Sequence, residues 1–153
     1  MLLHKRGNLL DLAEQGEFDV VLHGCNCFCT MGAGIAKEIR SRYPGAWRVD
    51  QDTDSGDINK LGNWTEYHTK GFTIINAYTQ FGMSNGSDVF EYTSFKLILQ
   101  KLVHLYGDQR FGLPYIGMGL AGGDKPWILS MIEVFAEDVH AKGGTVTLVE
   151  FGK

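Results

Sequence analysis

The stretch HGCNCFCTMGAGIAK, residues 23–37, joins an apolar segment to the start of a helical pattern. Before it, Val20, Val21 and Leu22 are typical of a buried strand end, and after it apolar residues recur at helical spacing from Ile35. Glycines at such a crossing let backbone N–H groups approach a ligand without a side chain in the way. The first helical turn adds unpaired N–H donors and the positive end of the helix dipole. The stretch therefore predicts an anion-binding loop, with a tight turn closed for packing as the alternative.

The composition is that of a globular protein. The chain has 153 residues, of which 44% are hydrophobic and 21% charged, so we expect one domain over residues 1–153. No apolar run is long enough to span a bilayer, and the first residues lack the order of a signal peptide, so we expect a cytoplasmic protein without membrane binding. The net charge is −4 and the basic residues are scattered, which argues against nonspecific nucleic-acid binding.

Three cysteines, Cys25, Cys27 and Cys29, lie close together in the first loop. Disulfides between such near neighbours are sterically poor. A metal site would need a fourth ligand, for which His23 is the nearby candidate, so we expect no metal and no cofactor. A cysteine nucleophile for phosphoryl transfer is also disfavoured, because no arginine follows within the loop to complete a ring of donors.

Hydrophobic periodicity predicts strands that alternate with helices along the chain. The expected strands are residues 2–5, 18–22, 61–68, 72–78, 111–116 and 145–151. The expected helices are a short one capped by Asn8, one from the glycine loop to the residue before Pro44, further turns at 46–50, one over 95–106, and one capped by Asp124. This alternation predicts an α/β sheet with helices on both faces.

Two connections follow from turn chemistry. Residues 61–68 and 72–78 form a hairpin, in which Gly71 is expected to supply a positive φ. The polar segment 79–88 is expected to be a flexible loop that could cover a site.

A second glycine-rich stretch, GMGLAGG at 117–123, repeats the arrangement of the first loop. It also follows a predicted strand and precedes a predicted helix, and sheets of this class bind ligands beyond the carboxyl ends of their strands. Together the two loops predict a clamp on one ligand that carries two or more phosphates.

Three motifs in this order resemble the macrodomain family of ADP-ribose-binding modules. They are KRGNLL at 5–10, HGCN at 23–26 with MGAGIA at 31–36, and PYIGMGLAGG at 114–123 with Trp127. The resemblance covers almost the whole chain and implies a single macrodomain, a three-layer α/β/α fold around a central mixed sheet. The first loop is most similar to the branch with yeast-type ADP-ribose-1″-phosphate phosphatases and terminal ADP-ribose glycohydrolases.

The resemblance implies where ADP-ribose would bind. Asn8 stands where the family usually has an aspartate for the adenine amino group, and Phe151 matches an aromatic that stacks on adenine, although it could simply cap the core. Asn26 would bond the distal ribose, with a backbone-bonding turn as the alternative. The other ligand-binding residues that the resemblance implies are Leu9, Cys25, Met31, Gly32, Ala33, Gly34, Ile35, Ala36, Ile116, Gly117, Met118, Gly119, Leu120 and Ala121.

The sequence departs from the glycohydrolases of this branch at two places. They use a lysine near the end of the strand predicted at 72–78 and an acidic residue after the second loop's Gly-x-Gly-Leu, where this chain has Asn76-Ala77-Tyr78 and Ala121. No lysine lies between Gly71 and Glu91. A lysine-based attack on the ribose therefore lacks its nucleophile.

The first hypothesis for function is thus a phosphatase that removes the 1″-phosphate of ADP-ribose 1″-phosphate. Its candidate catalytic residues are His23 as the group that titrates near neutral pH, Asn26 to orient the ligand, and Asp124 as an acid. A structural role at the strand end is the alternative for His23, and a helix cap is the alternative for Asp124. The alternative functions are a non-catalytic ADP-ribose reader, including of ADP-ribosylated protein, and a mono-ADP-ribosyl-protein hydrolase.

Overall fold

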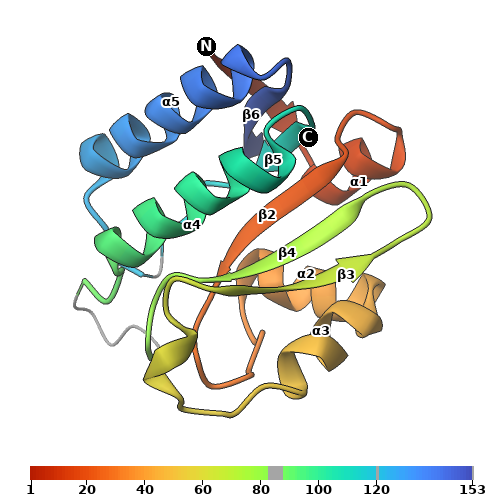
Figure 1. The fold of residues 1–153 in the computed structure, drawn as a ribbon. Coiled ribbons are helices and arrows are strands. Elements are labelled where there is room, and N and C mark those ends of the chain that lie inside the picture. Colours follow the sequence, from red (N-terminus) through yellow and green to blue (C-terminus); the bar gives the residue numbers. More distant parts are fainter. Residues whose placement is uncertain (83–87, 120, 153) are drawn as a thin grey trace.

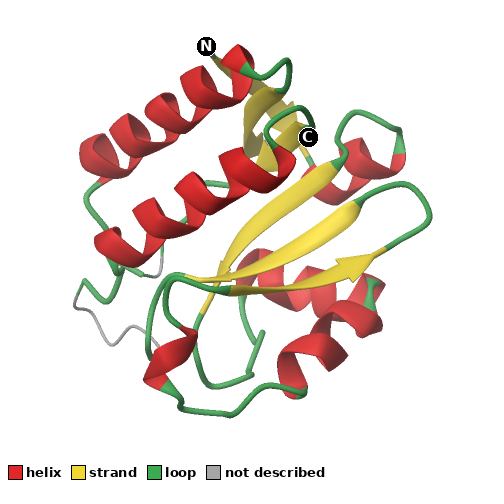
Figure 2. Cartoon of the chain, viewed as in Figure 1, coloured by secondary structure: helices red, strands yellow, loops and turns green. Residues whose placement is uncertain are grey.

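The chain forms one mixed six-stranded sheet between helical layers (Figures 1 and 2). The computed structural model describes residues 1–82, 88–119 and 121–152. The strands are β1 (Leu2–Gly7), β2 (Val20–Cys25), β3 (Trp64–His68), β4 (Thr73–Tyr78), β5 (Arg110–Leu113) and β6 (Thr145–Phe151). Their order is β1-β6-β5-β2-β4-β3, and every neighbouring pair is parallel except β3 with β4.

Helices cover both faces of the sheet. They are α1 (Leu9–Glu14), α2 (Gly34–Arg42), α3 (Pro44–Gln51), the short 3-10 helix η1 (Ile58–Lys60), α4 (Tyr92–Tyr106) and α5 (Lys125–Ala141). α4 and α5 lie side by side on one face, and α1, α2 and α3 pack on the other (Figure 1). The predicted three-layer α/β/α fold with a mixed sheet is confirmed.

The two cores follow from the alternation of side chains along the strands. On β2, Val20 and Leu22 pack beneath α4 and α5, whereas Val21 between them packs beneath α1 and α2. All three are buried, because a central parallel strand has helices over both faces. β2 is therefore fixed in the middle of the molecule, and the loop that follows it starts from a rigid base.

The predicted helix caps are confirmed. Asn8 Oδ1 accepts a hydrogen bond from the Asp11 N–H, 2.9 Å away, at the start of α1. Asp124 Oδ1 does the same for the Trp127 N–H at 3.0 Å, at the start of α5. Pro44 serves both neighbouring helices, since it ends α2 and occupies the first turn of α3, where its missing N–H costs nothing.

Several predicted boundaries differ from the observed ones. β2 runs on to Cys25 rather than ending at Leu22, and β5 ends at Leu113 because Pro114 has no N–H to continue the ladder. The hairpin of β3 and β4 is present, but Gly71 does not have a positive φ, so that detail was wrong. The Thr69 hydroxyl closes this turn instead, by accepting from the N–H groups of Gly71 and Phe72.

Two further expectations concern a covering loop and membrane-spanning helices. The proposed covering role of segment 79–88 depends on residues 83–87, which lie outside the described residues. None of the helices within the described ranges is long and apolar enough to cross a bilayer.

Candidate functional site

A cavity of about 430 Å³ opens beyond the carboxyl ends of β2, β4 and β5, and we call it the glycine cavity. Both glycine loops contribute to its wall, as the sequence predicted, because their strands end at the same edge of the sheet. Its lining residues are Gly24, Cys25, Asn26, Thr30, Met31, Gly32, Ala33, Gly34, Ile35, Ala36, Asp50, Thr79, Gln80, Pro114, Tyr115, Ile116, Gly117, Gly119 and Ala121.

The first loop has buried side chains at Cys29 and Met31 and an exposed backbone at the residues that follow. Cys29 and Met31 have φ values of 60° and 41°, a left-handed conformation that residues other than glycine rarely adopt. Their side chains are buried, whereas Gly32, Ala33 and Gly34 are exposed on the rim. The loop therefore presents mostly backbone to the cavity.

The N-terminus of α2 supplies hydrogen-bond donors at the cavity wall. Ala33 is its N-cap and has no capping side chain, so the first N–H groups of the helix are left for a ligand. Gly34, Ile35 and Ala36 of this first turn all line the cavity. The helix dipole favours a negative charge here.

The second loop approaches closely through its glycines. Gly117 has a φ of 76°, and a Cβ atom there would lie 2.5 Å from the Phe90 ring. A Cβ atom on Gly123 would lie 2.6 Å from the carbonyl oxygen of Gly117. These contacts show that the predicted glycines are needed for the compact shape of the loop as well as for access.

Thr79 contributes to the lining of the cavity a buried polar group that lacks a hydrogen bond within the part of the chain that the structure describes. It is buried directly after β4, and its hydroxyl has no hydrogen-bond partner among the described residues. A Cβ atom on Gly24 would lie 2.7 Å from this hydroxyl, so glycine is required beside it. Buried hydroxyls normally have a partner, and a bound ligand could provide one.

Asp50 is the acidic residue that sequence reasoning missed. It lies on α3, is only 1% exposed, and lines the cavity. Tyr78 donates its hydroxyl to Asp50 Oδ1 at 2.7 Å. Burial raises the pKa of the Asp50 carboxyl, although the Tyr78 hydrogen bond and the Lys60 charge oppose this. The available signal was a carboxylate on the same helix as the apolar Ala46 and Trp47, in a segment treated only as extra helical turns.

A second cavity, of about 370 Å³, adjoins the first and is called here the Phe151 cavity. Its lining residues are Gly7, Asn8, Leu9, Gly34, Ile35, Glu38, Pro114, Val149 and Phe151. Gly34, Ile35 and Pro114 line both cavities, so the two meet at the N-terminus of α2. The Phe151 side chain is 76% exposed, so it does not cap the core.

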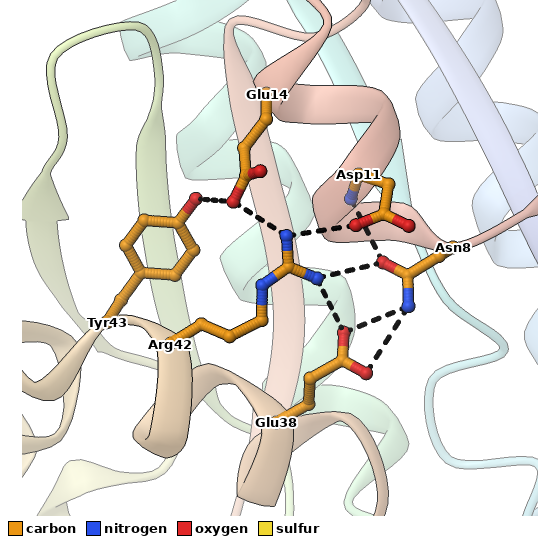
Figure 3. Close-up of polar contacts among 6 residues, drawn as sticks. All are labelled: Asn8, Asp11, Glu14, Glu38, Arg42 and Tyr43. Carbon is orange, nitrogen blue, oxygen red and sulfur yellow. Dashed lines mark hydrogen bonds and ion pairs between the residues drawn. The ribbon is translucent and has the colours of Figure 1, made fainter.

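Two polar residues of this lining, Asn8 and Glu38, belong to a polar cluster. Figure 3 shows its members, which are Asn8, Asp11, Glu14, Glu38, Arg42 and Tyr43. Arg42 contacts Asn8 and Glu38 through Nη1, at 3.3 and 3.4 Å. Through Nη2 it pairs with Asp11 and Glu14, at 3.0 and 2.7 Å. The cluster ties α2 to α1, from its N-cap Asn8 to its last residue Glu14.

The described residues contain no group of three or more histidine, cysteine or acidic side chains placed to hold a metal ion. The cysteines are free and buried. Burial raises the pKa of the thiols of Cys25 and Cys27, so both remain protonated near neutral pH and are poor nucleophiles.

The sequence was compared with known proteins. No protein-family model matches the sequence. The chain is 28% identical over 145 residues to an uncharacterised 17.5 kDa protein from the tk-vs intergenic region of Enterobacteria phage T4, covering 88% of this chain and 90% of that protein. It is 30% identical over 59 residues to an ADP-ribose 1″-phosphate phosphatase of Ajellomyces capsulatus, covering 39% of this chain but only 23% of that protein.

Solved structures share the fold over almost the full chain. The macrodomain of Mycobacterium tuberculosis DarG superposes with a TM-score of 0.77 at 17% identity and covers 97% of both chains. The chain has the macrodomain fold. A Trypanosoma brucei macrodomain in complex with ADP-ribose matches with a TM-score of 0.68 at 15% identity, over 99% of this chain and 64% of that one. Thermosipho africanus DarTG in complex with ADP-ribose gives 0.70 at 13% identity, over 89% of this chain and 38% of that one.

Within this macrodomain fold, His23 does not lie at the mouth of the strand as expected. It is fully buried inside β2 and does not line either cavity. Its Nε2 lies 2.7 Å from Oδ1 of Asn76, the residue opposite it on β4, and burial lowers the pKa of His23 to about 4. A neutral, enclosed imidazole matches the structural role, so we do not retain His23 as a catalytic candidate.

The other two catalytic candidates, Asn26 and Asp124, do not lie in the same cavity. Asn26 lines the glycine cavity, but its Oδ1 accepts from the Phe28 N–H and its Nδ2 donates to Thr30 Oγ1, both at 2.8 Å. The alternative turn role is therefore present, with one amide hydrogen left for a ligand. Asp124 is exposed, caps α5 and lines neither cavity, so it does not meet the others.

Most of the expected ligand-binding residues lie together. Met118 is the exception among the described ones, because it lines neither cavity. Leu120 lies outside the described residues. The rest line the two cavities, which agrees with the expectation, and their contacts with a ligand stay a prediction.

Proposed function

We propose that the chain binds ADP-ribose across the two adjoining cavities. The observation that carries the proposal is that Gly34, Ile35 and Pro114 line both cavities at the N-terminus of α2. A diphosphate at this junction would accept from the helix N–H groups. The base would then lie beside Phe151, and the distal ribose beside Asn26 and Thr79. Neighbours of the same fold that were solved with ADP-ribose support the choice of ligand.

Calorimetry with ADP-ribose, ADP and AMP tests this proposal. Affinity is expected to fall in that order, because each shorter ligand leaves part of the glycine cavity empty. Phe151→Ala should weaken all three, since stacking on an aromatic ring contributes to base binding. Leu105→Ala, which removes an exposed apolar side chain from α4, is the matched control and should bind as the wild type does. Equal affinity for the three ligands would exclude a distal ribose site in the glycine cavity.

We further propose hydrolysis of the 1″-phosphate of ADP-ribose 1″-phosphate as the reaction. The partial similarity to a phosphatase of that name supports it. In the reaction a water oxygen bonds to phosphorus, the bond from phosphorus to the 1″-oxygen breaks, and the proton lost by water ends on that oxygen. Asp50 is our candidate for moving this proton, because it is the acidic residue in the lining of the glycine cavity and burial raises its pKa.

Phosphate release by Asp50→Asn tests this role. The variant keeps an acceptor for the Tyr78 hydroxyl, so it should fold and bind ADP-ribose normally. Its turnover should fall by about a hundredfold or more, the usual effect of losing a general acid or base. Asp52→Asn, at the exposed end of α3, is the control and should keep wild-type turnover. Binding without phosphate release in the wild type would leave a reader, or a hydrolase of protein-linked ADP-ribose, as the function.

A further inference from the structure

The Phe151 cavity has one polar wall. Glycine, leucine, isoleucine, proline and valine residues form most of its lining, and the exposed Phe151 ring stands at its edge. Asn8 and Glu38 are the polar side chains in the lining. Asn8 and Glu38 are therefore the side chains of this lining that can form a hydrogen bond with an aromatic base in the cavity.

Asn8 has little capacity left for a ligand. Its Oδ1 accepts from the Asp11 N–H at 2.9 Å and from Arg42 Nη1 at 3.3 Å, which uses both lone pairs of an amide oxygen. Its Nδ2 faces the Glu38 carboxylate, at 3.1 Å from Oε1 and 3.3 Å from Oε2. The side chain that caps α1 is thus already bonded within the cluster (Figure 3).

Glu38 retains free acceptor capacity. Oε1 accepts from Asn8 Nδ2 and Arg42 Nη1, whereas Oε2 has only the longer Asn8 contact among the described residues. The side chain is 33% exposed, so a ligand can reach it. A carboxylate accepts about four hydrogen bonds and donates none when ionised. Arg42 orients it by bridging to Asp11 and Glu14 on its other side.

We infer that Glu38, rather than Asn8, recognises the base of the nucleotide and makes the cavity selective for a base that carries an amino group. This inference rests on the proposed binding of ADP-ribose. The amino group donates to Glu38, in a hydrogen bond strengthened by the charge of the carboxylate. A base with a carbonyl oxygen at the same position would place this oxygen against the Glu38 carboxylate. Neither oxygen can donate, so each would be left without a hydrogen bond.

The test compares ADP-ribose with its hypoxanthine analogue, inosine diphosphate ribose, which has a carbonyl in place of the amino group. Calorimetry on the wild type should show at least about a tenfold preference for ADP-ribose, the usual range for a hydrogen bond to a charged group. Glu38→Gln should reduce this preference to less than about threefold, because the glutamine amide can donate to a carbonyl as well as accept.

Asp11→Asn is the matched control. Asp11 also pairs with Arg42, but it does not line the cavity. This variant therefore weakens the cluster without changing the side chains that would contact the base. It should retain the wild-type preference, and thermal unfolding should show both variants folded. Equal binding of the two ligands by the wild type, or an unchanged preference in Glu38→Gln, would overturn the role of Glu38 while ADP-ribose binding stands. Absence of any ADP-ribose binding would instead overturn the proposed function, and the inference with it.

Discussion

At the scale of single residues, the buried His23 makes the stability of the fold sensitive to mild acid. Asn76 Nδ2 donates to the Ala46 carbonyl and to Thr65 Oγ1, at 3.0 Å each, which directs its Oδ1 toward His23. The imidazole must then carry its proton on Nε2 and donate. Neutral His23 is thus a cross-strand partner for Asn76, and protonation of its second nitrogen would place a charge in the core.

We predict that His23 makes the protein less stable in mild acid. Its pKa is about 4 in the fold against an ordinary 6.5, so the unfolded chain binds the extra proton first. The contribution of neutral His23 to stability is therefore lost as the pH falls from 6.5 towards 4, and this loss is complete below that. The full loss is about 3 kcal/mol, since each tenfold change in proton affinity is about 1.4 kcal/mol.

Urea unfolding at a series of pH values measures this loss. His23→Gln keeps an amide donor for Asn76 but does not titrate, so its free energy of unfolding should change much less between pH 6.5 and 4. His104→Gln, at an exposed position on α4, serves as the control and should follow the wild type. The same pH dependence in His23→Gln and wild type would contradict the prediction.

At the scale of elements, caps and strand ends decide which residues reach the site. Asp124 caps α5 with its side chain, and its backbone N–H donates to the Tyr92 hydroxyl at 2.8 Å, which ties α5 to the start of α4. A residue committed to this junction is not directed toward the cavities. Its contribution should therefore appear in stability and not in ligand binding.

We predict that Asp124→Ala lowers the free energy of unfolding by about 1 kcal/mol, the usual cost of losing a helix N-cap. Asp124→Ser, which restores a capping oxygen, should recover most of this loss. Chemical denaturation gives the stability of each variant, and calorimetry with ADP-ribose should give unchanged affinity. If Asp124→Ala instead weakened binding at wild-type stability, the residue would belong to the site after all.

The sequence predicted these elements well where local chemistry determines them. Asn8 and Asp124 could be recognised as caps because their short polar side chains precede helical periodicity. The end of β2 could not be recognised in this way, because a histidine followed by a glycine is typical of a position just after a strand. Only the partner strand shows otherwise, since Asn76 on β4 supplies the hydrogen bond that lets His23 remain buried.

At the scale of the whole molecule, the site depends on contacts between segments distant in sequence. The two glycine loops could be paired from the sequence because each follows a strand and precedes a helix. Asp50 could not be added to them, because its helix reaches the cavity only after packing against the face of the sheet that carries Ile74. Glu38 required the same information, since its neighbours Asn8 and Phe151 lie near opposite ends of the chain.

The shape of the first loop has a consequence for the thermodynamics of binding. Cys29 and Met31 anchor the loop with buried side chains. The exposed residues on the rim of the cavity are Gly32, Ala33 and Gly34. Glycine and alanine have no side-chain rotamers to lose on contact with a ligand. A ligand that docks on this rim therefore finds donors already in position, and little conformational entropy is lost when they are used.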